Sequence, residues 1–180
     1  RRNTCFDCTY ALAPGDTLPG RLITVGNMAN VNAAKSRVAG ADLVVILVND
    51  SYYGGAGAPG VATAYNGASM RRVATHEMAH SASNLGDEYV TGGNYTGAEP
   101  SKPNLSLVSS PSLVKWSAWS WTLSNSETVG CYAGGDGWAT GINRPVSTAC
   151  HMNSDLSKPY CCVCREALLK TLHVGTNYLM

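Results

Sequence analysis

The segment His76-Glu77-Met78-Ala79-His80 has the residue types and the spacing of a metal-assisted hydrolytic site. On a helix, residues four positions apart lie about 40° apart around the axis and one turn along it. Both imidazoles can then face one metal ion, and Glu77 can reach a metal-bound water. Zinc hydrolysis requires two neutral nitrogen ligands and a carboxylate base. We therefore predict His76 and His80 as zinc ligands and Glu77 as the general base, against the alternative of two ordinary helical histidines.

A third protein ligand is expected, because a catalytic zinc usually leaves only its fourth position to water. Glu99 lies at the distance that a ligand on a second helix would need, but the surrounding residues 96–101 do not read as a helix. Gly86 permits a sharp turn directly after the first helix, and Asp87 follows it. We predict Asp87 as the third ligand, with Glu88 as the alternative. The other interpretation of Asp87 is a carboxylate that stabilises the turn.

Hydrophobic patterns predict the elements around this motif. The run Leu43–Val48 reads as a short strand buried on both faces. Residues 52–60 read as a flexible glycine-rich loop, and Val61–Tyr65 as an edge strand to which an extended substrate could add. Residues 69–85 read as the active-site helix, with Gly86 as its C-terminal stop.

The remaining elements are less regular. Residues 27–39 are expected to form a short helix, and residues 92–112 a long irregular stretch. Residues 162–174 are expected to form a C-terminal helix whose core-facing side chains are Leu168, Leu169 and Leu172. The sequence thus predicts an α+β fold with an α/β-type first half and a loop-rich second half.

Composition narrows the functional class. The chain has 180 residues and a net charge of +1, so it lacks the basic surface of a nucleic-acid-binding protein. Its longest apolar run, Leu43–Val48, is far shorter than the ~20 residues of a membrane-spanning helix. The chain begins Arg1-Arg2 and shows no signal-peptide pattern, which we interpret as a mature form without its leader.

Seven cysteines favour an oxidising compartment, and we expect three disulfides and one free thiol. Two Cys-x-x-Cys pairs, 5/8 and 161/164, leave a four-cysteine zinc site and a redox motif as alternatives. Their separation is far larger than the usual gap of about 15–20 residues in such zinc sites.

The run from His76 to Tyr89 (His-Glu-x-x-His-Ser-x-x-x-Leu-x-Asp-Glu-Tyr) resembles the signature of the IgA-cleaving metallopeptidase family, which belongs to the metzincin-like zinc peptidases. The segment 47–55, with its Tyr-Gly-Gly, resembles the strand and loop of that family. Further family-like motifs follow in order: Lys115-Trp116, Arg144-Pro145, Cys150-x-Met152 and Cys161-x-Val163-Cys164-Arg165-Glu166. The resemblance spans residues 42–170.

The resemblance implies a metzincin-like fold with a twisted sheet, an active-site helix, a Met-turn at Met152 and a C-terminal helix. It implies His76, His80 and Asp87 as zinc ligands and Glu77 as the base. Ser83 and Asn84 stand where the family tends to have glycine, which alters the turn before the third ligand. Candidate contacts to the substrate or transition state are Tyr53, Gly54, Gly55, Tyr89, His151 and Tyr160.

We therefore expect a secreted, zinc-dependent endopeptidase. Residues 1–180 would form a single catalytic domain with subdomains of about 1–86 and 87–180. It would act as a monomer on protein or peptide substrates, and bind neither nucleic acid nor membranes. The alternatives are a non-catalytic binding module on a peptidase fold, or a zinc amidase that acts on a non-protein amide.

Overall fold

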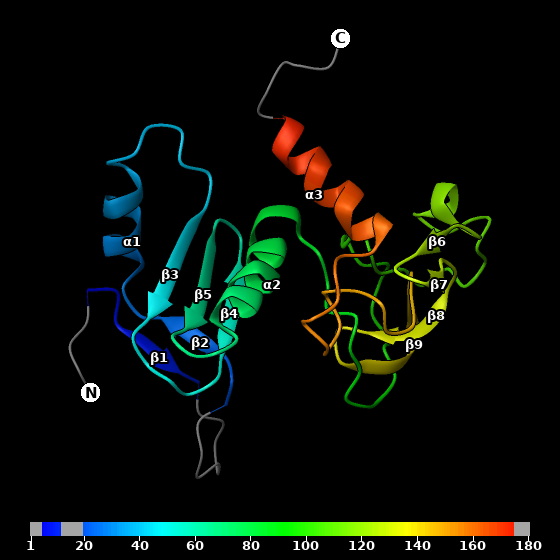
Figure 1. Cartoon of the computed structure of the whole chain (residues 1–180), viewed down its shortest axis with the longest axis horizontal. Coiled ribbons are helices and arrows are strands. Elements are labelled where there is room, and N and C mark those ends of the chain that lie inside the picture. The colour runs from blue at the N-terminus through cyan, green and yellow to red at the C-terminus, as the bar shows by residue number, and fades with distance from the viewer. Residues whose placement is uncertain (1–4, 12–19, 175–180) are drawn as a thin grey trace. The chain divides into compact units, whose positions relative to one another are not determined.

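The computed structural model describes residues 5–11 and 20–174. The chain divides into two compact units, Arg1–Ala82 and Ser83–Met180, and each contains both helix and sheet (Figure 1). The predicted α+β class is confirmed. The observed boundary lies close to the predicted division at residue 86, while a single catalytic domain remains a prediction.

The first unit is built on a three-stranded sheet with strand order β3-β5-β4. Strand β5 (Val61–Tyr65) pairs in parallel with β3 (Val44–Val48) and antiparallel with β4 (Gly55–Ala58). A smaller antiparallel pair, β1 (Cys8–Tyr10) and β2 (Ile23–Val25), adjoins the sheet through a bridge between Leu22 and Gly55. Buried Ile23, Val31, Ile46, Ala62 and Ala64 contribute its core.

The sheet corrects three predictions. Val61–Tyr65 is a central strand rather than an edge strand, since residues 55–58, expected to be loop, form β4 on its other side. Strand β3 is buried on one face only: Ile46 is buried, whereas Val45 and Leu47 are 38% and 55% exposed. Alternate residues of a strand point to opposite faces. The apolar run therefore reflects the strand propensity of its β-branched residues, and it does not mean that both faces of the strand are buried.

The first unit contains one whole helix and nearly all of a second helix. Helix α1 (Met28–Lys35) is shorter than the expected 27–39, and the side chain of Asn27 caps it by accepting the backbone N–H of Asn30. Helix α2 (Met70–Ser83) is the expected active-site helix. It ends where Asn84 adopts a left-handed φ of 51°, so Gly86 is not the residue that stops it. Asparagine is one of the few residues besides glycine that accept this conformation readily.

Gly86 is needed for another reason, which lies in the second unit. A Cβ at this position would lie 2.3 Å from Cδ1 of Leu105. The backbone N–H of Gly86 donates to Oδ1 of Asn104 at 2.7 Å, and its carbonyl accepts from Nδ2 of the same side chain at 2.8 Å. The glycine therefore allows the chain to pass close to Leu105 and Asn104.

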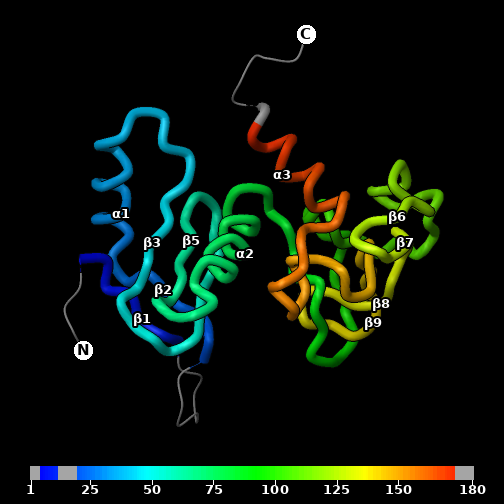
Figure 2. Tube along the Cα trace, viewed as in Figure 1, coloured from blue at the N-terminus to red at the C-terminus, as the bar shows by residue number. Residues whose placement is uncertain are grey.

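The second unit consists mainly of loops that connect short hairpins. Strands β6 (Leu123–Ser124) and β7 (Glu127–Thr128) form a hairpin whose two turn residues both have positive φ, as in a type I′ turn. Strands β8 (Tyr132–Gly135) and β9 (Trp138–Arg144) form the larger hairpin, and the short helix η1 spans Ser117–Trp119. Figure 2 shows the irregular stretch that begins near residue 92 beside these strands, and single bridges join it to β9.

Helix α3 (Cys162–Val174) has the predicted bounds, but its buried face differs from the prediction. Leu169 and Leu172 are 54% and 68% exposed, and the buried residues lie instead in and just before the first turn, at Cys161, Val163 and Cys164. The leucine spacing therefore predicts an apolar face of α3, and Leu169 and Leu172 on this face are exposed in the structure. Within the described residues, no helix combines the length and apolarity needed to cross a membrane.

Candidate active site

His76 and His80 lie one turn apart on α2, as the spacing predicts. His76 is buried and His80 half-buried, and their Nε2 atoms are 3.1 Å apart. Two nitrogens bound to one tetrahedral zinc at about 2.0–2.1 Å stand roughly 3.3 Å apart. The two imidazoles thus already converge at a separation that fits a shared metal ion.

Glu77 lies against strand β4, where two glycines make the close approach possible. A Cβ on Gly55 would lie 2.9 Å from Oε1 of Glu77 and 2.7 Å from Cγ1 of Val73. A Cβ on Gly57 would lie 2.5 Å from the carbonyl oxygen of Glu77 and 2.6 Å from Cβ of His80. Both glycines therefore let α2 pack directly on the strand. Gly55, predicted as a substrate contact, has this packing role in the structure.

Ser81 joins the same helix to the central strand. Its hydroxyl lies 2.8 Å from the carbonyl oxygen of Val61 and 2.7 Å from that of Glu77, within hydrogen-bonding distance of both. This contact and the glycines of β4 fix the rotation of α2 about its own axis. The sheet of the first unit thereby orients the His-Glu-x-x-His motif.

Asp87 lies in the second unit, and both its backbone N–H and its backbone carbonyl are hydrogen-bonded to Asp136. The backbone N–H of Asp87 donates to Oδ1 of Asp136 at 2.9 Å, and the carbonyl of Asp87 accepts the N–H of Asp136 at 2.8 Å. Asp136 also forms an ion pair with Lys102 at 2.6 Å. The backbone at the predicted third ligand is therefore fixed by neighbouring groups within its own unit.

Glu99, the alternative at longer spacing, has other partners. Its carboxylate pairs with Lys115 at 2.9 Å and accepts the backbone N–H of Leu107 at 2.7 Å. Lys115 also donates to the carbonyl oxygens of Lys102 and Leu105, at 3.1 and 2.8 Å. The Lys-Trp motif therefore organises the irregular stretch around Glu99.

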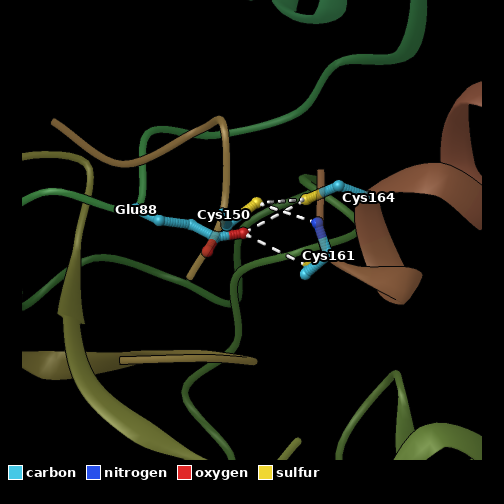
Figure 3. A group of neighbouring side chains, drawn as sticks. All are labelled: Glu88, Cys150, Cys161 and Cys164. Carbon is cyan, nitrogen blue, oxygen red and sulfur yellow. Dashed lines mark hydrogen bonds between the residues drawn. The ribbon is translucent and has the colours of Figure 1, made fainter. Parts of the chain in front are cut away.

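Glu88, the adjacent alternative for the third ligand, is fully buried and lies among Cys150, Cys161 and Cys164 (Figure 3). Burial raises the pKa of Glu88 to about 8, further assisted by the neighbouring Cys161 and opposed by the hydrogen bond from Asn104. The structure thus places this carboxylate in a cluster of side chains of types that could bind a metal ion.

Met152 is fully buried in a tight turn, in which the N–H of Asn153 donates to the carbonyl of Cys150 at 3.0 Å. The carbonyl of Met152 accepts the N–H of Glu88 at 2.7 Å. His151 is also buried, and its Nδ1 lies 3.1 Å from the carbonyl oxygen of Lys158. Its ring packs edge-on against that of Tyr160, with the two ring centres 4.8 Å apart. The predicted turn exists, whereas its position beneath a metal remains a prediction.

The other predicted contact residues lie at different depths. Tyr53 is 40% exposed, with the guanidinium of Arg21 5.4 Å from its ring centre, and burial raises the pKa of its phenol. Gly54 is buried, and a Cβ there would lie 2.4 Å from the carbonyl oxygen of Arg21. Tyr89 is half-buried, and its carbonyl accepts the N–H of Gly137 at 3.2 Å. Their contacts with a substrate remain predictions.

Comparison with known proteins decides the family. The family model described as IgA Peptidase M64 matches residues 2–125, which include the whole segment from His76 to Tyr89. The chain belongs to the IgA peptidase M64 family. It is therefore a peptidase, as the resemblance implies. A search among curated proteins finds no match.

The cysteines of this M64 peptidase depart from the predicted arrangement. All seven lie in the part of the chain that the structure describes, and they are unpaired there, so no disulfide appears. The Sγ atoms of Cys150 and Cys164 are 3.7 Å apart. Our prediction considered zinc between the two Cys-x-x-Cys pairs and missed the actual cluster. The signal was the grouping of Cys150, Cys161 and Cys164 in family-like motifs, but nothing in the sequence links them to Glu88.

Proposed function

We propose that this M64 peptidase is a zinc-dependent endopeptidase, with zinc held by His76, His80 and Asp87 and with Glu77 as general base. The convergence of the two Nε2 atoms on α2, with Glu77 between them in sequence, carries the proposal. Membership of a peptidase family supports a peptide bond as the substrate.

The assignment of Asp87 rests on donor chemistry and chain distance. Asp87 follows His80 by seven residues, and the left-handed Asn84 turns the chain immediately after α2. Two imidazoles and one carboxylate are a donor set that catalytic zinc sites use. Three protein ligands of this kind leave one position for water, as catalytic zinc sites require.

A bound zinc ion would supply Lewis acidity and lower the pKa of a coordinated water to about 7. The carboxylate of Glu77 takes the proton of the attacking water and delivers it to the leaving amine. Gly55 and Gly57 hold the helix that carries Glu77 against β4, so that this carboxylate is positioned before substrate binds. Tyr89, His151 and Tyr160 are the proposed candidates for contacts with the developing oxyanion.

An extended substrate would add to the outer edge of β4 rather than to β5. Peptides extend sheets by pairing with a strand that has a free edge. In the described part of the sheet, β5 has a partner on each side, whereas β4 pairs with β5 on one side and is bridged on its outer side at Gly55, by Leu22, which leaves the outer edge at residues 56–58 for a peptide. We further propose that the enzyme is secreted and acts as a monomer.

The substitution Glu77→Gln tests the mechanism. We expect hydrolysis of casein to fall by about 10²–10⁴-fold, because general acid–base catalysis contributes on that order. Zinc content should stay unchanged, since Glu77 is not a ligand. Met78→Ala serves as the control, because Met78 is the next residue and is exposed.

Two outcomes would contradict the proposal. Casein cleavage by Glu77→Gln at the parent rate would remove Glu77 from the mechanism. A parent protein that binds zinc and cleaves no protein, with or without a chelator, would favour the amidase or the binding module instead.

A further inference from the structure

A second group of metal-binding side chains lies wholly within the second unit. It brings together Glu88, Cys150, Cys161 and Cys164, whose ligand atoms all lie within 4.8 Å of one another. Figure 3 shows the carboxylate facing the three sulfur atoms, with Cys164 on α3. All four residues are fully buried, and none of them belongs to the candidate active site proposed above.

The spacing of the ligand atoms resembles a tetrahedral zinc site. Two sulfurs bound to one zinc at about 2.3 Å stand roughly 3.8 Å apart, and a sulfur and an oxygen roughly 3.5 Å apart. The Sγ atoms of Cys150 and Cys164 are 3.7 Å apart. Oε1 of Glu88 lies 3.1 Å from Sγ of Cys164 and 4.0 Å from Sγ of Cys161.

Hydrogen bonds around the group are those expected around anionic ligands. The backbone N–H of Cys161 donates to Sγ of Cys150 at 3.4 Å. Nδ2 of Asn104 donates to Oε1 of Glu88 at 3.0 Å, and this amide is itself fully buried. Such outer contacts orient ligands and raise metal affinity.

Disulfide formation explains the group less well. A disulfide bond needs two sulfurs about 2.05 Å apart, and three cysteines are an odd number. A bond between Cys150 and Cys164 would leave the thiol of Cys161 and the carboxylate of Glu88 buried together. Among the described residues, Oε2 of Glu88 has no hydrogen-bond partner, so the carboxylate lacks a full set of neutral donors there.

We propose that Glu88, Cys150, Cys161 and Cys164 bind a structural Zn²⁺ ion. Thiolate sulfur favours zinc over calcium or magnesium, and four protein ligands leave no position for a catalytic water. Binding releases the protons of the ligands to solvent, and the divalent cation compensates the negative charge that the ligands then carry.

The ion would hold together three segments that are distant in sequence. Glu88 follows the connection after α2, Cys150 lies in the turn at Met152, and Cys161 and Cys164 lie at the start of α3. The described part of the second unit contains two-stranded sheets and much irregular chain, so a metal crosslink would supply stability that a larger sheet could otherwise provide. It would also fix the backbone next to Asp87.

The test uses the full chain with His76 and His80 both replaced by alanine. This variant lacks the histidines proposed for the active site, so the zinc it retains reports on the second group. After dialysis, mass spectrometry of the metal content should find about one zinc per chain. X-ray absorption at the zinc edge should show sulfur neighbours at about 2.3 Å.

Two further substitutions, each made in the variant that lacks His76 and His80, test whether the retained zinc depends on the proposed ligands. Cys164→Ser should remove most of the zinc, whereas Cys162→Ser should retain it. Cys162 is a matched control because it is buried in the same turn of α3 but lies outside the group.

Three results would overturn the proposal. They are a folded His76→Ala/His80→Ala variant without metal, bound iron in place of zinc, or a Cys150–Cys164 disulfide found in the intact protein under non-reducing conditions. The readout is metal content rather than hydrolysis, so failure here is separate from failure of the Glu77 mechanism.

Discussion

The two candidate metal-binding regions of this chain are organised in opposite ways. His76, Glu77 and His80 sit on one helix, α2, and their relation follows from helical geometry alone. Glu88 and its three cysteines come from separate segments and meet only through the fold of the second unit. The first arrangement is local and readable as a motif. The second depends on every turn that brings those segments together.

The substitution Asn104→Ala should have the largest effect on stability. The Asn104 side chain bonds both backbone groups of Gly86 and also Oε1 of Glu88, all in a buried setting. Leaving these groups without partners should cost about 3 kcal/mol or more in the free energy of unfolding. Urea unfolding followed by tryptophan fluorescence measures this cost.

The same variant separates the two regions. Because Asn104 donates to the proposed ligand Glu88, Asn104→Ala should lower the zinc affinity of the Glu88 group by about 10–100-fold. The zinc affinity of the histidine pair should stay unchanged. Asn94→Ala, an exposed asparagine of the same unit, is the control and should cost less than about 1 kcal/mol. Equal costs for the two variants would show that Asn104 does not support the cluster.

Gly57→Ala should perturb the helix-based region next. The new Cβ would meet the backbone oxygen of Glu77 at 2.5 Å, and backbone cannot move aside as a flexible side chain does. We expect a loss of about 1–3 kcal/mol in stability, typical of overpacking, and a lower kcat through displaced Glu77. Thermal unfolding and casein hydrolysis measure the two effects.

Gly130→Ala is the matched control for Gly57→Ala. Its new Cβ would meet only Cε2 of Tyr132, at 3.5 Å, which is an ordinary contact. Its stability should stay within about 0.5 kcal/mol of the parent. An active and fully stable Gly57→Ala variant would refute the role of the β4 glycines in positioning α2.

Glu127→Gln should have the smallest effect, of about 1 kcal/mol, because this carboxylate is half-exposed. It accepts the backbone N–H of Ser147 at 2.7 Å and the N–H and hydroxyl of Thr148, just before the turn at Met152. Partial burial raises its pKa, but these hydrogen bonds outweigh burial, and the net pKa is lowered.

The sign of the pH dependence follows from this lowered pKa. The contribution of Glu127 is fully present above its unfolded pKa of about 4.3 and is lost as pH falls through the lower folded pKa. Parent and variant should therefore converge in stability once the pH has fallen below this lowered folded-state pKa. A difference that persists unchanged at acid pH, measured by urea unfolding, would show that the carboxylate charge is not responsible.

Local patterns predicted the helices better than the sheets. The bounds of α3 match the prediction, and α2 differs by one residue at its start and two at its end, because both depend on apolar spacing and nearby stop signals. The order of the three strands was not predictable, since β5 becomes central only when the glycine-rich segment 55–58 folds back as β4. The exposed Leu169 and Leu172 show that periodicity finds an apolar face but not what covers it.

By itself the sequence determined the family and the histidine–glutamate motif, because helical spacing fixes which side chains share a face. Only the tertiary structure decided the surroundings of Glu88. Asp87 and Glu88 are neighbours and both carboxylates, so sequence ranks them as alternative ligands of one metal. The fold buries Glu88 among cysteines more than 60 residues away, and long-range packing of that kind leaves no local pattern in the chain.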